Sequence, residues 1–273
     1  MKINKVWAVF FSPTGGTEKV AVTVAQTVAK ALHTQYCSFR FTLPQNRENE
    51  VVFGEGDLVV LGTPVIAGRV PNLLLSYLND KIRGAGAIGV PVVSFGNRNY
   101  DDALIELRNI MEDKGFQTIA GGAFVSEHSF SRKLGAGRPD AEDIAQLTAF
   151  GEKIAEKVNS GWEYDGPVFV KGEEPIRPYF TPRDRHEGAI DIRKVKPKTG
   201  PECCNCGICA EVCPMGSISK EDPSVIAGIC IKCCACIKKC SVGAKHFDDP
   251  GFIYHKEELE ELYERRAEDE YFV

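Results

Sequence analysis

The chain has 273 residues, of which 43% are hydrophobic and 26% are charged, ordinary values for a folded protein. They exclude a wholly disordered chain, and no stretch approaches the roughly 20 consecutive apolar residues of a membrane span. With 38 acidic and 33 basic residues the net charge is -5, which argues against nucleic acid as the main partner because phosphate binding needs a basic surface. At roughly 100 to 200 residues per domain, the length predicts two domains.

Cysteine is unevenly distributed along the chain. Of the eleven cysteines, Cys37 stands alone and the other ten lie between Cys203 and Cys240. The apolar run near the N-terminus covers only residues 6–11, which is shorter than the roughly 7 to 15 residues of a signal-peptide core. We therefore expect a cytoplasmic protein, in which clustered cysteines are metal or cluster ligands more often than disulfides.

Residues 1–160 have the pattern of an α/β domain. Short apolar runs rich in Val, Ile and Phe alternate with longer amphipathic stretches, as in a parallel sheet with crossover helices. The runs are apolar enough to be covered on both faces. The predicted strands cover residues 6–11, 36–42, 57–62, 89–95 and 121–126, and the predicted helices cover 17–32, 72–78, 101–114 and 141–158. The sequence predicts a doubly wound, five-stranded parallel sheet.

A loop suited to an anion follows the first predicted strand. Short hydroxyl side chains and glycines at a strand-to-helix turn leave backbone N–H groups free, and the start of a helix favours negative charge. This loop contains Ser12, Thr14, Gly15, Gly16 and Thr17. It predicts a monophosphate site, and the alternative is a helix capped by Thr14 or Thr17 that binds nothing. Residues 84–89 match a dinucleotide motif letter for letter, but they precede a strand and are rejected for that reason.

Residues 161–199 form a predicted connector, because periodicity fades, five prolines occur and charges of both signs are mixed. So long a structureless segment would be unusual, and we expect residues 168–170 and 189–195 to pack onto a domain.

Residues 249–273 are predicted to form an acidic C-terminal helix, chiefly over 256–270. A stripe of Leu259, Leu262 and Tyr263 would dock it, and the alternative is a dedicated binding tail.

The clustered cysteines form an internal duplication. The first copy places Cys203, Cys206, Cys209 and Cys213 at the spacing C-x2-C-x2-C-x3-C, and the second repeats it 27 residues later at Cys230, Cys233, Cys236 and Cys240. Two copies of this spacing are typical of a bacterial two-cluster ferredoxin, in which three cysteines of each run hold one [4Fe-4S] cluster and the fourth crosses to the other. By that rule one cluster takes Cys203, Cys206, Cys209 and Cys240, and the other takes Cys230, Cys233, Cys236 and Cys213.

Zinc is the main alternative for these cysteines. Structural zinc sites usually separate two cysteine pairs by a longer loop, whereas these runs are continuous triplets with a fourth cysteine at a fixed offset. Cys204 and Cys234 fall outside the spacing and are interpreted as small buried residues, the alternative being a redox or ligand role.

The second copy carries more positive charge than the first. Its lysines are Lys232, Lys238, Lys239 and, just beyond, Lys245. Cations favour the more negative reduced state of a cluster, so we predict that the second cluster has the higher potential. The alternative is a solvated or docking face.

On these residues the chain resembles the flavodoxin/ferredoxin fusion proteins of anaerobic prokaryotes. The loop over residues 12–17 looks like a flavodoxin phosphate loop at the start of residues 1–160, and the cysteine spacing looks like a ferredoxin over residues 200–248. The resemblance implies FMN in the first region, with its phosphate on that loop, at the carboxyl ends of the strands. It implies two [4Fe-4S] clusters in a small α+β domain in the second.

In flavodoxins two further loops sandwich the flavin ring. By resemblance the first contains Thr63, Pro64, Val65, Ile66, Ala67 and Gly68, and the second contains Phe95, Gly96, Asn97, Arg98, Tyr100 and Asp101. A backbone carbonyl of the first loop turns toward the flavin N5 when it becomes protonated, and Ala67-Gly68 suits that role. The chain departs from the family at Ile66, where an aromatic is common, and at Arg69, where acidic residues are common.

Three side chains near this edge have two interpretations each. Arg69 either stabilises a reduced flavin near N1, making the flavin easier to reduce, or pairs elsewhere on the surface. Tyr100 either stacks on the ring or caps the next helix. His128 either donates to a flavin or substrate or is an ordinary loop residue.

The leading hypothesis is an electron-transfer protein that passes electrons between two clusters and FMN and exchanges them with soluble redox proteins in anaerobic metabolism. The sequence shows no nucleophile, acid–base pair or substrate motif, and a carrier needs none. The first alternative is a flavin-dependent reductase of a small substrate fed by the clusters, with His128 or Tyr100 assisting. The second is a ferredoxin whose flavodoxin-like part is an apo docking domain.

Overall fold

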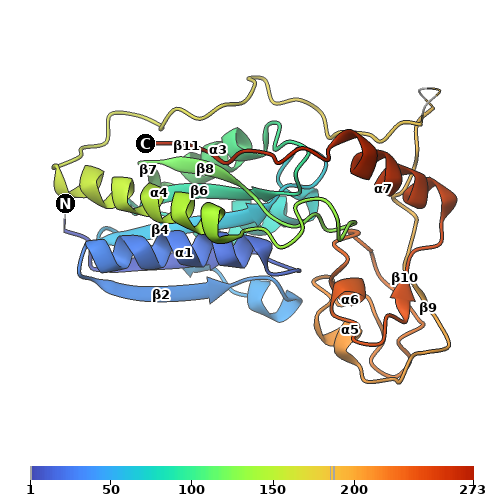
Figure 1. Ribbon diagram of the computed structural model, residues 1–273. Coiled ribbons are helices and arrows are strands. Elements are labelled where there is room, and N and C mark those ends of the chain that lie inside the picture. Colours follow the sequence, from blue (N-terminus) through green and yellow to red (C-terminus); the bar gives the residue numbers. More distant parts are fainter. Residues whose placement is uncertain (1, 185, 187) are drawn as a thin grey trace.

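The computed structural model describes residues 2–184, 186 and 188–273 and is built around one central sheet (Figure 1). Its main strands are β1 (Lys5–Phe10), β2 (Gln35–Arg40), β4 (Asp57–Pro64), β6 (Ile88–Phe95) and β8 (Gly121–Val125). They run parallel in the order β2-β1-β4-β6-β8. Counted along the chain this is 2-1-3-4-5, the flavodoxin-like doubly wound order, so the predicted α/β fold class is confirmed.

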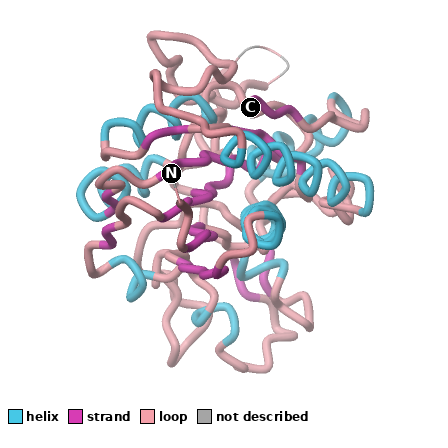
Figure 2. The backbone as a smooth tube through the Cα atoms, turned by 90° about the vertical axis from the view of Figure 1, so that its left-hand side faces the viewer, coloured by secondary structure: helices cyan, strands magenta, loops and turns pink. Residues whose placement is uncertain are grey.

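Helices cover both faces of the sheet, and Figure 2 shows the strands lying between them. The helices of this part are α1 (Gly16–Ala31), α2 (Leu75–Lys81), α3 (Ala103–Asp113) and α4 (Ala141–Asn159), with 3-10 turns at Pro44–Arg47 and Asn72–Leu74. Alternate residues of β4 point to opposite faces. Leu58 and Val60 pack with α1 and α4, whereas Val59 and Leu61 pack with α2 and α3. Burial on both faces explains why the strands are continuous apolar runs.

The sheet has seven strands among the described residues, so the prediction of five was wrong by two. The short β7 (Gln117–Thr118) pairs with β6, and β11 (Glu270–Phe272) pairs antiparallel with β8 at the edge. The ring of Tyr271 packs 5.0 Å from that of Phe150. A three-residue strand at the end of an acidic segment carries no periodic signal, because its pairing is set by residues far away in the sequence. Two further short strands, β3 (Val51–Val52) and β5 (Ile82–Arg83), pair apart from this sheet.

The C-terminal helix begins earlier and ends earlier than predicted. Helix α7 (Pro250–Leu262) begins after Asp249, whose side chain accepts the Phe252 N–H at 2.9 Å. The prediction of helix as far as residue 270 was wrong beyond Leu262. The predicted docking stripe was also wrong at Leu262, which is 64% exposed, because α7 buries Phe252, His255 and Leu259 instead. The following chain is held outside helical geometry because Asn97 Nδ2 donates to the carbonyls of Tyr263 and Arg265, each at 2.6 Å.

The first part of the connector lies against residues 1–160, which confirms the prediction for residues 168–170, whereas residues 189–195 are exposed or half-buried. Val170 is buried, and Val168 packs on the same core. Further along, the Ile190 N–H donates to the Pro182 carbonyl at 2.9 Å. The carboxylate of Asp102, with no exposed surface, accepts the Arg177 N–H at 2.8 Å and anchors the middle of the segment.

The cysteine segment is a small unit beyond the carboxyl ends of the parallel strands (Figure 1). Strands β9 (Lys198–Thr199) and β10 (Lys245–His246) pair antiparallel and close its two ends together. Each cysteine triplet leads into a short helix, α5 (Ile208–Glu211) or α6 (Ala235–Lys238). None of the helices in the described part of the chain has the length and apolar character that crossing a bilayer requires.

Candidate functional site

The loop between β1 and α1 presents unused backbone donors. Helix α1 begins after Gly15, which has φ 102° and makes no side-chain cap, so neither Thr14 nor Thr17 caps it. Thr17 Oγ1 instead lies 2.6 Å from Ser94 Oγ, and Ser12 Oγ accepts the Glu18 N–H at 3.0 Å. Within the described residues no acceptor takes the N–H groups of Thr14, Gly15, Gly16 and Thr17. Free N–H groups at a helix start are the geometry that binds an anion.

A cavity of about 740 Å³ lies where the sheet edge meets the connector, α7 and the cysteine segment. Seven of the predicted flavin-loop residues line it: Val65, Ile66, Ala67, Gly68, Phe95, Gly96 and Arg98. From the cysteine segment it is lined by Cys230, Lys232 and Cys233. Residues that sequence reasoning missed also line it, among them Phe180 and Ile190 of the connector. The connector carried no pattern that pointed to a cavity, because its contacts are set by the fold.

The other predicted flavin residues lie outside this lining. Residues 12–17 form the separate anion loop, and Thr63 is buried with its Oγ1 unpaired among the described residues. Asn97 is fully used by the C-terminal segment, since its Oδ1 also accepts the Ala267 N–H at 3.2 Å. Pro64 is the last residue of β4 and lies at the carboxyl end of this central strand.

Tyr100 and Asp101 are each bound by a side chain of the protein. The Tyr100 hydroxyl donates to Glu270 of β11, and its ring lies 5.6 Å from that of Phe95, with 5% of the residue exposed. Asp101 forms an ion pair with Arg98. Tyr100 therefore joins the C-terminal strand to the core.

The first flavin loop forms a tight turn. Ile66 and Arg69 exchange both backbone hydrogen bonds, and Ala67 and Gly68 between them have φ 52° and φ 77°. Gly68 is required there because an added Cβ would collide with the Asp101 carboxylate. The Ala67 carbonyl accepts the N–H of Phe180 at 2.8 Å, so the connector holds this turn.

Arg69 pairs away from the cavity. Its guanidinium donates to both carboxylate oxygens of Glu106 at 2.6 and 2.7 Å and lies 4.7 Å from the ring centre of Tyr179. This is the surface-pairing interpretation, and Arg69 is not among the residues that line the cavity.

His128 lies in the cavity wall as a neutral imidazole. Burial, with the charge of Lys238 acting in the same direction, lowers the pKa of His128 to about 4. Its Nδ1 accepts the Phe130 N–H at 3.1 Å, so the proton of the neutral ring is on Nε2. Gly96 is required beside it, because a Cβ there would collide with the imidazole. The imidazole can therefore donate a hydrogen bond but carries no charge at neutral pH.

The duplication in the cysteine sequence is also present in the backbone. Positive φ occurs at three pairs of positions that are 27 residues apart: Asn205 (53°) and Lys232 (56°), Gly207 (76°) and Cys234 (57°), and Gly216 (58°) and Gly243 (68°). Gly207 and Cys234 are the N-caps of α5 and α6. Cys234 thus occupies the place of a glycine in the first copy and is buried as predicted, whereas the same prediction was wrong for Cys204, which is exposed.

The four cysteines predicted for the second cluster share one cavity. Cys213, Cys230, Cys233 and Cys236 line it together with apolar side chains such as Ile218 and Ile231. The crossing cysteine from the first copy thus lies with the triplet of the second copy. None of the eleven cysteines, all of which lie in the described residues, forms a disulfide. Within the described residues no three His, Cys, Asp or Glu side chains gather around one metal ion, whereas the thiolates of a cube each bind a different iron.

The first quartet lies nearer to solvent. Cys206 is exposed, Cys203 and Cys240 are intermediate, and Cys209 is buried. Burial would raise the pKa of Cys240, but backbone N–H groups of residues 242–245 lower it overall. Such donors around a sulfur stabilise a thiolate, the form that binds iron.

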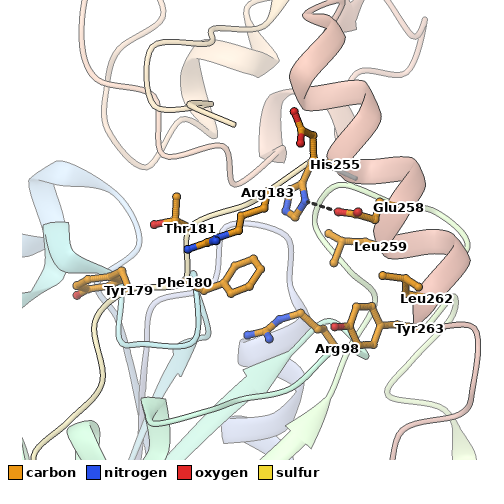
Figure 3. Close-up of a pocket in the computed structure, with 11 residues that line it drawn as sticks. Arg98, Tyr179, Phe180, Thr181, Arg183, His255, Glu258, Leu259, Leu262 and Tyr263 are labelled. Carbon is orange, nitrogen blue, oxygen red and sulfur yellow. Dashed lines mark ion pairs between the residues drawn. The ribbon is translucent and has the colours of Figure 1, made fainter. Parts of the chain in front are cut away.

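A second pocket of about 540 Å³ adjoins the cavity (Figure 3). Phe180 and Arg98 line both, and the guanidinium of Arg98 lies 4.7 Å from the centre of the Phe180 ring. His255 from α7 faces it with Glu258 3.9 Å away, and its Nδ1 has no hydrogen-bond partner in the described part of the chain. Phe180 is one of six residues that line both spaces, the others being Arg98, Tyr179, Thr181, His255 and Leu259.

No protein-family model and no curated protein matches the chain. Among solved structures it is similar to an archaeal flavodoxin (16% identity, TM-score 0.42, covering 57% of this chain and 99% of that one). It is also similar to a Streptococcus pneumoniae flavodoxin (23%, 0.40, 56% and 99%) and to rubredoxin:oxygen oxidoreductase from Desulfovibrio gigas (17%, 0.41, 58% and 37%). With TM-scores below 0.5 these similarities carry no functional conclusion, and the flavodoxin-like assignment rests on the strand order.

Proposed function

We propose that this protein transfers electrons between an FMN bound to residues 1–160 and two [4Fe-4S] clusters bound to residues 200–248, with residues 161–199 as a connector and 249–273 as a C-terminal cover. The observation that carries the proposal is the 740 Å³ cavity, since one space is lined by both predicted flavin loops and by Cys230 and Cys233. Soluble redox proteins of the cytoplasm would be its donors and acceptors. FMN exchanges one or two electrons, whereas a cluster exchanges one.

The chain offers groups suited to each part of FMN. The N–H groups of residues 14–17 would hold the phosphate, and Thr17 and Ser12 are already ordered by hydrogen bonds. Val65, Ile66 and Phe95 provide apolar surface for the ring. His128 donates from a neutral imidazole, and Arg98 supplies a cation at the same wall.

The cysteines suit the clusters by number, spacing and placement. The quartet of Cys213, Cys230, Cys233 and Cys236 surrounds one apolar cavity, which would exclude water from the bound cluster. The other quartet, Cys203, Cys206, Cys209 and Cys240, combines a buried thiol with an exposed one. The second quartet would therefore face the flavin, and the first would face the partner.

The test is cofactor content under strictly anaerobic conditions. The full chain, reconstituted with iron, sulfide and FMN, should contain stoichiometric flavin that is released on denaturation, together with iron and sulfide for two clusters. Photoreduction of the flavin should then reduce a cluster in the same molecule. Clusters without flavin would favour the docking-domain alternative, and bound zinc or disulfides would overturn the proposal.

A reductase of a small molecule is the second candidate, and the pocket that adjoins the cavity favours it. Phe180 is 43% exposed and lines both spaces, so its truncation to alanine should widen the connection between them. Reoxidation of the reduced protein by 1,4-benzoquinone should be saturable in a reductase, and Phe180→Ala should change the half-saturating concentration several-fold. Phe169→Ala is the matched control, because Phe169 is an exposed connector residue outside both spaces. If the reoxidation rate instead rises linearly with quinone concentration and Phe180→Ala does not change it, the reductase is excluded and the electron carrier is favoured.

A further inference from the structure

Lys238 ties the second cysteine copy to the flavodoxin-like part. Its Nζ donates to Glu127 Oε1 at 2.6 Å, to the His128 carbonyl at 2.6 Å and to the Ser131 carbonyl at 3.2 Å. All three ammonium donors have acceptors, and the side chain is only 11% exposed. Removing an ammonium group from water costs free energy, and hydrogen bonds to its partners must compensate for that cost.

The position of Lys238 relates the two predicted redox sites directly. On its own side it lies in α6, between the predicted ligands Cys236 and Cys240. On the other side its acceptors belong to the loop that follows β8, and His128 of that loop lines the 740 Å³ cavity. A single side chain thus joins the cysteine helix to the cavity wall.

The first copy of the repeat has no such contact at the equivalent position. Displaced by 27 residues from Lys238 stands Glu211, which is exposed. The lysine is therefore not part of the duplicated ligand loop. It occurs only in the second copy, where it contacts the loop that follows β8.

Two other cations hold backbone next to cysteines predicted for the second cluster. Arg47 Nη2 donates to the Pro214 carbonyl at 2.6 Å, next to Cys213. Lys232 Nζ donates to the Cys230 carbonyl at 2.9 Å and to the Arg193 carbonyl. Of these cations, Lys238 is the one that reaches a carboxylate of the flavodoxin-like part and the loop of His128.

We propose that Lys238 is a positioning residue that fixes the second cluster relative to the flavin. The inference rests on the proposed function and adds to it a specific device for electron transfer inside the molecule. Electron tunnelling falls steeply with distance, so loss of this contact should slow internal transfer while both cofactors stay bound. The conservative change to arginine should retain the cation and part of the contact.

The experiment compares four full-length proteins reconstituted anaerobically with iron, sulfide and FMN: wild type, Lys238→Met, Lys238→Arg and the control Lys239→Met. Lys239 is the exposed neighbour in sequence, so its change alters charge near the same cluster without removing the contact. The measurements are cofactor content, the rate at which laser-photoreduced flavin passes its electron to a cluster, and the magnetic broadening of the flavin radical by the reduced cluster.

Lys238→Met should keep its flavin and iron, slow the internal transfer by about tenfold to a hundredfold, and reduce the radical broadening. Lys238→Arg should restore most of the rate, and Lys239→Met should match the wild type. Glu127→Gln weakens the same contact from the other side and should give a smaller effect in the same direction, which keeps the test valid if Lys238→Met loses iron. Full cofactor content with wild-type rate and broadening in Lys238→Met would overturn the inference alone, whereas a wild type without flavin or clusters would overturn the proposed function as well.

Discussion

The two copies of the cysteine repeat share a backbone but have different surroundings. In the first copy Cys206 is exposed and Glu211 projects into solvent. In the second, the equivalent Cys233 lines two cavities, and Lys238 is bound by the loop that follows β8. Equal spacing therefore produces equal ligand loops, while the contacts around them assign one copy to the surface and the other to the cavity. Exposure and hydrogen bonding are the means by which a protein makes two like clusters behave differently.

The largest expected effect comes from removing one ligand from each copy. Cys236→Ser should lose roughly half of the iron and stop electron transfer from the photoreduced flavin, because its cluster adjoins the cavity. Cys206→Ser should lose a similar amount of iron and keep that internal step. Iron analysis and flash photolysis check both, with Cys37→Ser in β2 as the matched control. Retention of the internal step in Cys236→Ser would reverse the order of the two clusters.

The C-terminal segment that packs against β8 predicts a pH effect on stability. Burial raises the pKa of Asp269 to about 6, and the Asp143 carboxylate adds to this, while the Val125 N–H opposes it. Because the folded-state pKa lies above the unfolded value of 3.8, this carboxyl stabilises the fold at low pH, and that stability is lost as the pH rises from about 4 to about 6.

Asp269→Asn does not titrate and should therefore be more stable than the wild type above pH 6, by about 2 to 3 kcal/mol, and no more stable near pH 4. Denaturant unfolding at both pH values measures the difference. If the stability difference between Asp269→Asn and the wild type is the same at both pH values, the carboxyl does not hold its proton in the folded state.

The smallest expected effect concerns the potentials of the two clusters. Lys232 is 8% exposed and binds the Cys230 carbonyl, so its charge is close to the second cluster and weakly screened. The second cluster should have the higher potential, and Lys232→Met should lower it on the order of tens of millivolts. Potentiometric titration followed by EPR separates the two clusters. The exposed Lys239→Met should shift the potential less, and an equal shift would show that burial does not matter.

The sequence by itself determined the elements whose signals are local. Continuous apolar runs predicted the parallel strands, since strands covered on both faces need apolar residues throughout, and the cysteine spacing predicted a duplication that is present in the backbone at the pairs Gly207 with Cys234 and Gly216 with Gly243. The loop residues at 12–17 predicted free N–H groups because glycine and strand-to-helix geometry act within a few residues.

Only the tertiary structure decided which of these parts meet. The cavity depends on the connector residue Phe180 and on α7, neither of which has a local pattern that points to it. Asn97 and Tyr100 were predicted at the flavin, yet their side chains bind the C-terminal segment. Their partners lie more than 160 residues later in the sequence and come close only in the folded chain. The same holds for Lys238, whose three acceptors lie more than 100 residues earlier in the sequence.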